Sequence, residues 1–339
     1  RGANIENILN FQKDYSNTQS FKLEQNYRSS KNIVAAANAV IAKNKDQFQK
    51  DVWTDNDQGS RIKVVKTKTD NEEGKAVANK ILNLKLEKQL ENQQFAILYR
   101  TNAQSRSMEE ALRKLNLPYK IYGGLSFYQR KEIKDLLSYY RMTFNPNDEE
   151  ALKRIINYPT RGIGKTTLDK LILTSNKNNK SIWEVISNID SYETGIGNGP
   201  KLKIKNFVTM ILSFGSELFR KNAFDLGQHI ASHTGLLKDL YDDKTPEGIS
   251  RYENIQELLN GLKQFSAQEE SSNTPSKTLD KFMEDVALLT DADNENQDDY
   301  NKISLMTIHS AKGLEFPYVF IVGMEENLFP SQLSVNSRS

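Results

Sequence analysis

The chain has 339 residues, of which 37% are hydrophobic and 27% are charged, so it can bury a core and still carry a strongly polar surface. No apolar run approaches the roughly 18 residues of a membrane-spanning helix, and the N-terminus lacks the basic start and apolar stretch of a secretory signal. The complete absence of cysteine excludes disulfides, thiolate zinc sites and cysteine nucleophiles. We therefore expect a cytoplasmic protein of about two domains without membrane contact and, because no initiator Met is present, part of a longer polypeptide.

The net charge of +2 conceals a segregation of charge along the chain. Residues 151–180 carry seven Lys or Arg and one Asp, whereas residues 269–299 carry ten acidic residues and two Lys. A basic segment is typical of a surface that meets a polyanion such as nucleic acid, and it is equally typical of an ordinary solvated face. Charge alone leaves both interpretations open.

Residues 1–122 alternate between helical and strand-like patterns. In chain order we expect a helix over 4–15, a short strand over 21–24, a helix over 33–41 with Ser30 as its N-cap, a strand over 61–66, a helix over 72–86, a strand over 95–99, a helix over 105–115 and a strand over 119–122. Strands that alternate with helices at this spacing predict a parallel sheet with crossover helices.

The pattern changes after residue 126. Helices are expected over 131–144, 149–157, 167–174, 202–219, 252–265 and 279–289, with polar turns such as 194–200 between them and no convincing strand. An acidic connector covers 291–299, and strands return over 303–308 and 318–322. We therefore predict an α/β domain built from residues 1–125 and 301–339, interrupted by an all-helical inserted domain over 126–300.

A glycine-rich turn lies inside the basic segment. Gly164-Lys165-Thr166 matches the end of a phosphate loop, but such a loop needs Gly where Pro159 stands and must follow a strand, whereas a helix is expected here. We interpret residues 158–165 as a hairpin between two helices, with Ile163 packed back between them. Arg161 and Lys165 then flank the N–H groups that could donate to a DNA phosphate. A tight turn that needs glycine only for a positive φ explains these residues equally well.

Polar side chains also follow three predicted strands. His309, Ser310, Lys312 and Glu315 come within seven residues after the strand over 303–308, which is typical of a site above a parallel sheet. Residues 25–29 and 99–102 occupy similar places, and an arginine beside an aromatic ring can hold a phosphate and stack a base. A capping turn with an exposed arginine is the simpler alternative at residues 25–29.

A metal site is not expected. His229 and His233 are four residues apart on a predicted helix, but neither the Glu of a metalloprotease motif nor a third ligand accompanies them.

Taken together, these segments resemble the PcrA/UvrD/Rep-type DNA helicases of superfamily one. Residues 23–29, Leu-Glu-Gln-Asn-Tyr-Arg-Ser, resemble motif IV of that family, and residues 95–106 match the signature that follows it. Residues 305–330, with Lys312-Gly313-Leu314-Glu315-Phe316 at their centre, resemble motif V, and Arg1-Gly2-Ala3 resembles the end of motif III. The resemblance extends over the whole chain and is strongest to the PcrA group of Gram-positive bacteria.

The resemblance implies a RecA-like fold and roles for individual residues. Arg28 would be the arginine finger at the γ-phosphate of ATP, Tyr27 would stack on adenine, and Gly313 and Glu315 would contact the same nucleotide. The DNA-binding positions would be Arg1, Arg100, Asn102, Thr160, Arg161, Gly162, Ile163, Gly164, Lys165, His309 and Lys312. The helical insertion would correspond to the mobile subdomain of the family, which binds duplex DNA through the hairpin.

Three family features are missing from the sequence. No phosphate loop follows a strand, no Asp-Glu pair stands at a strand end to hold Mg²⁺, and the last family motif does not follow Phe329-Pro330. We therefore expect the second half of a motor that unwinds DNA 3′ to 5′ in repair and replication, with the Mg²⁺ ligands outside this chain. Alone, the chain should not hydrolyse ATP.

The expected partners are DNA, the missing N-terminal RecA-like domain, and repair, plasmid replication or transcription proteins. One alternative is a DNA-junction or partner-docking module without a motor. Another is a stand-alone nucleotide-binding α/β protein, against which the missing phosphate loop argues.

Overall fold

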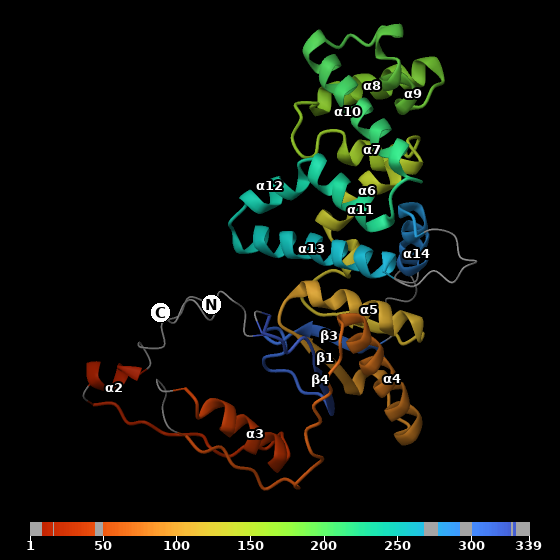
Figure 1. Ribbon diagram of the computed structural model, residues 1–339. Coiled ribbons are helices and arrows are strands. Elements are labelled where there is room, and N and C mark those ends of the chain that lie inside the picture. The colour runs from red at the N-terminus through yellow and green to blue at the C-terminus, as the bar shows by residue number, and fades with distance from the viewer. Residues whose placement is uncertain are drawn as a thin grey trace. The chain divides into compact units, whose positions relative to one another are not determined.

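The computed structural model describes residues 9–15, 17–44, 50–267, 277–291, 300–326 and 328–329 (Figure 1). Arg1, the connector over 292–299 and Pro330 lie outside the described residues. The chain divides into two compact units, residues 1–67 and residues 68–339.

In the first unit, the described residues include the helices α2 (Phe11–Asp14) and α3 (Lys31–Ile41). Ser30 stands at the N-cap of α3 in an extended conformation, and Val34 is the buried residue of that helix. The helix predicted over 4–15 is seen only as α2, and its first residues lie outside the described part of the chain.

The predictions of strands over 21–24 and 61–66 are wrong. Neither segment forms a strand, and among the described residues of this unit the only β-type pairing is the bridge between Gln25 and Trp53. Alternating apolar residues form a strand only where a neighbouring strand and a covering layer complete it. Here Leu23 and Val64 remain 83% and 93% exposed.

The second unit contains the predicted parallel sheet. Its strands are β1 (Phe95–Tyr99), β2 (Tyr119–Ile121), β3 (Ile303–Thr307) and β4 (Tyr318–Ile321), in the order β2-β3-β1-β4 with all neighbours parallel. The central strand β1 is almost wholly buried, which explains its unbroken apolar sequence. Helices α4 (Asp70–Lys88) and α5 (Ser105–Lys114) pack on each other and share a core with β1 and β3.

The helical part follows in the same unit. Its helices are α6 (Lys131–Phe144), α7 (Glu149–Ile155), α8 (Lys165–Asn178), α9 (Ile182–Ser187), α10 (Asn198–Glu217), α11 (Ala223–His233), α12 (Leu236–Asp242), α13 (Pro246–Ser266) and α14 (Leu279–Asp291). Single 3-10 turns are η1 (Asn92–Gln94), η2 (Asn102–Gln104), η3 (Phe127–Gln129) and η4 (Ile189–Ser191). Within the described residues from 126 to 300 no strand occurs, as predicted.

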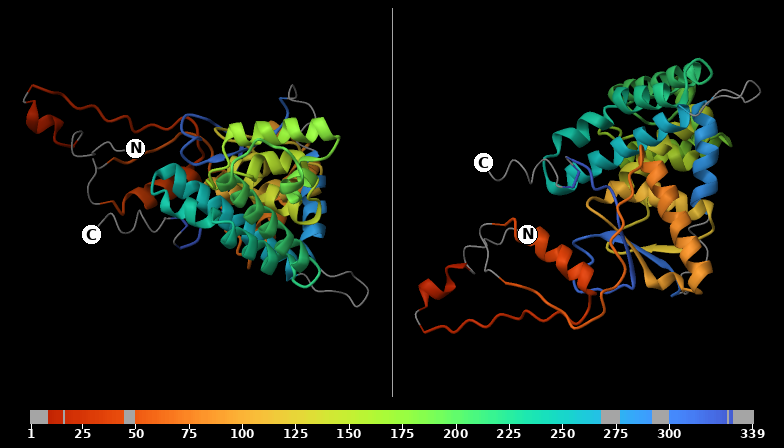
Figure 2. Two further views of the ribbon diagram at one scale, coloured as in Figure 1. Left: turned by 90° about the horizontal axis from the view of Figure 1, so that it is seen from above. Right: turned by 60° about the horizontal axis from the view of Figure 1, so that its bottom comes forward.

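The helical part has a core of its own, separate from the core under the sheet. Helix α13 lies where the helices meet the α/β layer, beside α5 (Figures 1 and 2). The parallel sheet with its helices is consistent with a RecA-like helicase domain interrupted by helices. Among the described residues, no helix has both the length and the hydrophobicity needed to cross a membrane.

Candidate nucleic-acid and nucleotide sites

The carboxyl ends of β1 and β3 bring two of the predicted segments together. Tyr99 and Thr307 are register partners at the ends of these neighbouring parallel strands. Arg100 and His309, which are 209 positions apart in the sequence, follow them, and Arg100 Nη1 lies 3.4 Å from His309 Nδ1. Asn102 lies in η2 on the same loop as Arg100, and Lys312 is exposed in the turn after β3. The edge therefore presents cationic and amide groups from both loops.

Local hydrogen bonds hold these two loops in place. Gln104 Oε1 accepts from the backbone N–H groups of Arg100 and Thr101, each at 2.9 Å. Thr307 Oγ1 accepts from the Ser310 backbone N–H at 3.2 Å and lies 2.9 Å from Ser310 Oγ. The functional side chains thus stand on turns whose main chain is already bonded.

Gln104 is a site residue that the sequence analysis missed. Its side chain packs against Gly323, the second residue after β4. The Gln104 amide fills the space that a Cβ would take if residue 323 were not glycine. The Gly323 N–H in turn donates to the Glu73 carboxylate at 3.0 Å. Burial raises the pKa of Glu73, and this hydrogen bond opposes the rise. The signal was present in the sequence, because Thr101 and Gln104 have the spacing of a capping box.

The predicted hairpin lies between α7 and α8. Gly162 has a φ of +74°, which only glycine adopts without strain, and Gly164 is the N-cap of α8. Ile163 is 1% exposed and packs into the helical core. Asn157 Oδ1 accepts from the backbone N–H groups of Arg161 and Ile163, at 3.0 and 2.9 Å.

The structure gives Arg161 a different environment from Lys165. The Arg161 guanidinium donates to three main-chain carbonyls, those of Ile155 at 3.1 Å, Pro159 at 3.2 Å and Thr234 at 3.0 Å. It therefore points into the protein and holds the hairpin to the end of α11. Lys165 and Thr160, by contrast, are exposed.

A second hairpin of the same kind precedes α10, in the stretch predicted as a polar turn. Gly195 has a φ of +62°, Ile196 is 8% exposed, and Gly197 is the N-cap of α10. The Ile196 N–H donates to Thr194 Oγ1 at 3.2 Å. The repeated Gly-Ile-Gly before a helix was the sequence signal for it.

Each hairpin is touched by a lysine from the helix of the other. Lys203 of α10 places its Nζ beside Gly162, where a Cβ would stand. Lys170 of α8 donates from Nζ to the Gly195 carbonyl at 2.6 Å. The two hairpins therefore lie side by side, and lysine side chains lie next to both of them.

In the first unit, Tyr27 and Arg28 occupy a turn set by Asn26. Asn26 Oδ1 accepts from the backbone N–H groups of Arg28 and Ser29, at 3.0 and 2.8 Å. The Tyr27 ring is 79% exposed, with its hydroxyl donating to Gln25 Oε1 at 2.6 Å, and Arg28 is also exposed. An accessible ring beside an accessible guanidinium fits a base and its phosphates. Gly313 and Glu315, exposed after β3, belong to the second unit.

The two histidines of α11 are packed on each other. Their ring centroids are 3.9 Å apart, and His233 Nδ1 lies 3.0 Å from the His229 carbonyl oxygen. Burial lowers the pKa of His229, and the neighbouring His233 and Lys221 lower it further. Among the described residues no group of three or more His, Asp or Glu is arranged to hold a metal ion.

Comparison with known proteins places the chain in a family. The profile of the UvrD-like helicase C-terminal domain matches residues 21–339. The chain is 41% identical over 340 residues to the ATP-dependent DNA helicase PcrA of Bacillus subtilis, 40% over 337 residues to that of Staphylococcus aureus and 38% over 331 residues to that of Leuconostoc citreum. These alignments cover 97–99% of this chain and 44–45% of each relative.

The chain therefore spans a little under half the length of these curated relatives. The matched residues include both loops at the carboxyl edge of the sheet and both helical hairpins. With the profile covering most of its length, the chain belongs to the family of UvrD-like helicase C-terminal domains.

Proposed function

We propose that this chain is the C-terminal half of an ATP-dependent DNA helicase that unwinds duplex DNA 3′ to 5′ in repair and replication in the cytoplasm. Residues 1–125 and 301–339 would form its second RecA-like domain, and residues 126–300 the helical insertion. The observation that carries the proposal is the meeting of Arg100 and His309 at the carboxyl edge of the sheet, in a chain of the UvrD-like family.

The residues at this edge would form a single-strand track, comprising Arg100, Asn102, His309 and Lys312. Cationic and amide groups bind phosphates without reading sequence, as a motor that moves along any strand requires. Arg1 would extend the track, and it lies outside the described residues.

The nucleotide would be ATP, held between this chain and the N-terminal RecA-like domain of the complete protein. Tyr27 would stack on the adenine, Gly313 and Glu315 would line the nucleotide site, and the Mg²⁺ ligands would lie outside this chain. Arg28 would face the γ-phosphate, where a guanidinium is worth a factor of about 10³ or more in turnover. Bound ATP and Mg²⁺ would supply the phosphoryl chemistry that drives the motor.

The hairpin over 160–165 would contact the duplex ahead of the single strand. The first N–H groups of α8 point away from the helix and Lys165 is exposed beside them, so a DNA phosphate can meet both. Such contacts position the protein on the duplex without specifying a sequence. Opening and closing between the two RecA-like domains would then move the track along the strand while the helical part holds the duplex.

A salt titration of binding tests the DNA-binding part of the proposal. The chain should bind a duplex with a 3′ single-stranded tail more tightly than a blunt duplex, with an affinity that falls steeply as salt rises. Arg100→Ala should lower affinity for the tailed duplex and reduce the slope of log affinity against log salt by about one. Equal affinity for both DNAs, unchanged by Arg100→Ala, would contradict the single-strand track.

The motor is tested separately in the full-length protein. Arg28→Ala should abolish DNA-stimulated ATP hydrolysis and leave DNA binding intact. A DNA-junction or partner-docking module, the competing interpretation, would keep its function in this variant. Robust DNA-stimulated hydrolysis by the 339-residue chain alone would contradict the assignment of the phosphate-binding residues to the missing half.

A further inference from the structure

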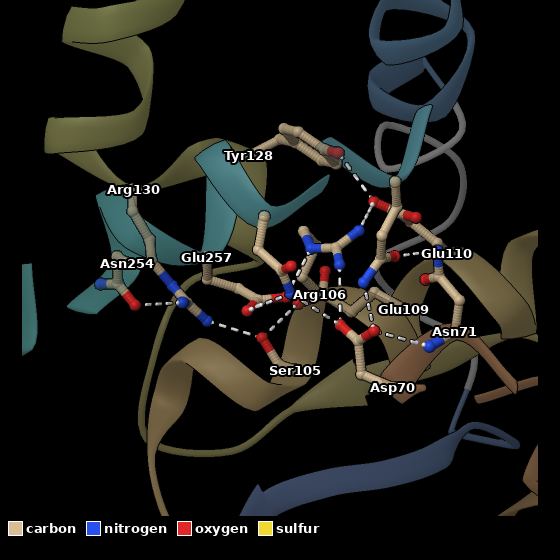
Figure 3. A network of polar contacts seen from close by, with 12 residues as sticks. Asp70, Asn71, Ser105, Arg106, Glu109, Glu110, Tyr128, Arg130, Asn254 and Glu257 are labelled. Carbon is tan, nitrogen blue, oxygen red and sulfur yellow. Dashed lines mark hydrogen bonds and ion pairs between the residues drawn. The ribbon is translucent and has the colours of Figure 1, made fainter. Parts of the chain in front are cut away.

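Two buried polar links connect the first turn of α5 to helix α13 of the helical part (Figure 3). Helix α5 starts at Ser105, directly after the η2 turn that carries Asn102 and closes on Arg100. Ser105 and Arg106 are both buried, at 0% and 2% exposure. Neither has a part in binding DNA or ATP as proposed above.

Arg106 makes the first link. Its Nε donates to Glu257 Oε1 of α13 at 2.7 Å, its Nη2 to Asp70 Oδ2 at the start of α4 at 2.9 Å, and its Nη1 to Glu110 Oε1 one turn along α5 at 3.1 Å. A buried guanidinium is stable only when its donors are paired, and its planar fork demands a fixed geometry. One side chain therefore sets α4, α5 and α13 relative to one another.

Ser105 makes the second link, through Arg130. Arg130 Nη2 donates to Ser105 Oγ at 2.7 Å, and Arg130 Nη1 donates to Asn254 Oδ1 of α13 at 2.9 Å. Asn254 Nδ2 then donates to Glu132 Oε1 at 2.6 Å. Asn254 is 4% exposed, so this chain of bonds is shielded from water. The first two residues of α5 are thus both linked to α13, Arg106 directly and Ser105 through Arg130.

Helix α13 also approaches the η2 turn and Arg106 closely. It packs against η2, and its Gly261 leaves room for Arg106, because a Cβ there would lie 3.1 Å from Arg106 Nη1. The Asp70 carboxylate that pairs with Arg106 also accepts from the side chains of Gln264 and Asn260 on α13. The contact therefore extends along the last three turns of α13.

We propose that Arg106 is a positioning residue for the single-strand track: by pairing with Glu257 it holds the Arg100–Gln104 turn against α13 while the helical part is seated on the α/β layer, so that the placement of the helical part affects the track. This inference rests on the proposed function, since it assigns a purpose to the turn that carries Arg100 and Asn102. A displacement of the helical part by duplex DNA would then shift the track, and strand binding would bias the helical part in return.

The test removes the link to α13 without leaving a buried charge alone. Glu257→Ala takes away one carboxylate, and Arg106 keeps Asp70 and Glu110 as partners, so the α/β layer should still fold. Glu257→Gln keeps an acceptor oxygen for Arg106 Nε and should restore most of the effect. The matched control is Glu247→Ala on the same helix, where the ion pair with Arg251 is exposed.

Each variant of the 339-residue chain is compared with the wild type by two measurements. Hydrogen–deuterium exchange of peptides covering residues 99–106 reports the turn itself, without DNA. Fluorescence anisotropy with a labelled oligothymidylate reports the track. For Glu257→Ala we expect faster exchange at the Arg100 and Thr101 amides and an affinity loss of about five- to tenfold. Glu257→Gln should lie near the wild type, and Glu247→Ala should change neither readout.

The outcomes separate this inference from the proposed function. Unchanged exchange and unchanged affinity in a folded Glu257→Ala protein would overturn the positioning role. Faster exchange with no loss of affinity would also overturn it, provided that Arg100→Ala does weaken strand binding. If Arg100→Ala binds like the wild type, the proposed track fails instead. Should Glu257→Ala not fold, Gly261→Ala displaces the same guanidinium without changing charge, and unaltered exchange in that variant would overturn the inference.

Discussion

The hairpins before α8 and α10 have the same Gly-Ile-Gly sequence and the same backbone, a positive φ followed by a buried isoleucine and a glycine N-cap. Their supports differ. Asn157 accepts two amides of the first hairpin, and Arg161 ties it to the end of α11. In the second, the Ile196 amide is bonded only locally, to Thr194.

The turn itself is determined by its local sequence, whereas its stiffness and charge come from the residues around it. Lys203 lies beside the first hairpin and Lys170 donates to the second, but exposed Lys165 directly follows the first hairpin, whereas Glu193 and Asn198 flank the second in the sequence. A DNA phosphate should therefore meet a stiffer and more positive surface at the first hairpin.

The largest effect is expected from removing the buried isoleucine. Ile163→Ala should lower the free energy of unfolding by about 2–4 kcal/mol, because it leaves a cavity in the helical core. Ile196→Ala should cost less, since that side chain is more exposed. Urea denaturation of both variants measures the difference, and equal losses would show that the two hairpins are supported equally well.

Removal of the Arg161 guanidinium should come next. Arg161→Ala leaves three carbonyls without their donor and should cost about 1–3 kcal/mol of stability. Arg161→Lys should not restore it, because an ammonium cannot reach all three oxygens. If Arg161→Ala instead weakened duplex binding at unchanged stability, the guanidinium would act on DNA rather than on the hairpin.

A change of pH should alter the stability of the contact between α13 and the α/β layer. It should not change the difference in stability between the two hairpins. Burial raises the pKa of Glu257 from 4.5 to about 7, with Arg106 opposing the rise. Because the folded state holds this proton more tightly than the unfolded state, the stability it contributes is complete below about pH 4.5 and is lost as pH rises through 7.

The free energy of unfolding should therefore fall between pH 5 and pH 8, by about 1.4 kcal/mol for each unit by which the pKa is raised. Glu257→Gln should flatten this dependence. The losses of unfolding free energy caused by Ile163→Ala and Arg161→Ala, measured relative to the wild type, should be the same at pH 5 and at pH 8. If the Glu257→Gln protein kept the full pH dependence of the unfolding free energy, that dependence would come from another titrating group.

The smallest effect on stability should carry the clearest information about DNA. In the free protein, no atom lies within 4 Å of a Cβ built on Gly164 or Gly197, and both have an extended backbone with negative φ. Serine is a good N-cap, so Gly164→Ser and Gly197→Ser should change stability by only a few tenths of a kcal/mol. Gly164→Ser should nevertheless weaken duplex binding in a salt titration, because its side chain stands where the phosphate would approach, and Gly197→Ser should weaken it less. Equal effects would mean that both hairpins meet the duplex alike.

Local sequence patterns account for the elements that carry their own periodicity, and the motifs account for the family to which the chain belongs. The strand over 95–99 follows from its unbroken apolar run, and α6 follows from its helical spacing, because local pattern decides such elements. The first hairpin was also predictable, since a positive φ before a helix selects glycine.

Which remote groups these elements contact depends on the tertiary fold and cannot be read from a local pattern. Residues 61–66 have the alternation of a strand, yet no neighbouring strand among the described residues pairs with them. Arg161 was expected beside a phosphate, but three carbonyls, one of them 73 positions away, take its donors. The meeting of Arg100 with His309, and of Arg106 with Glu257, depends on strand order and on the seating of α13. A charged side chain goes to the partners that the fold brings within reach, and no local pattern records which partners those are.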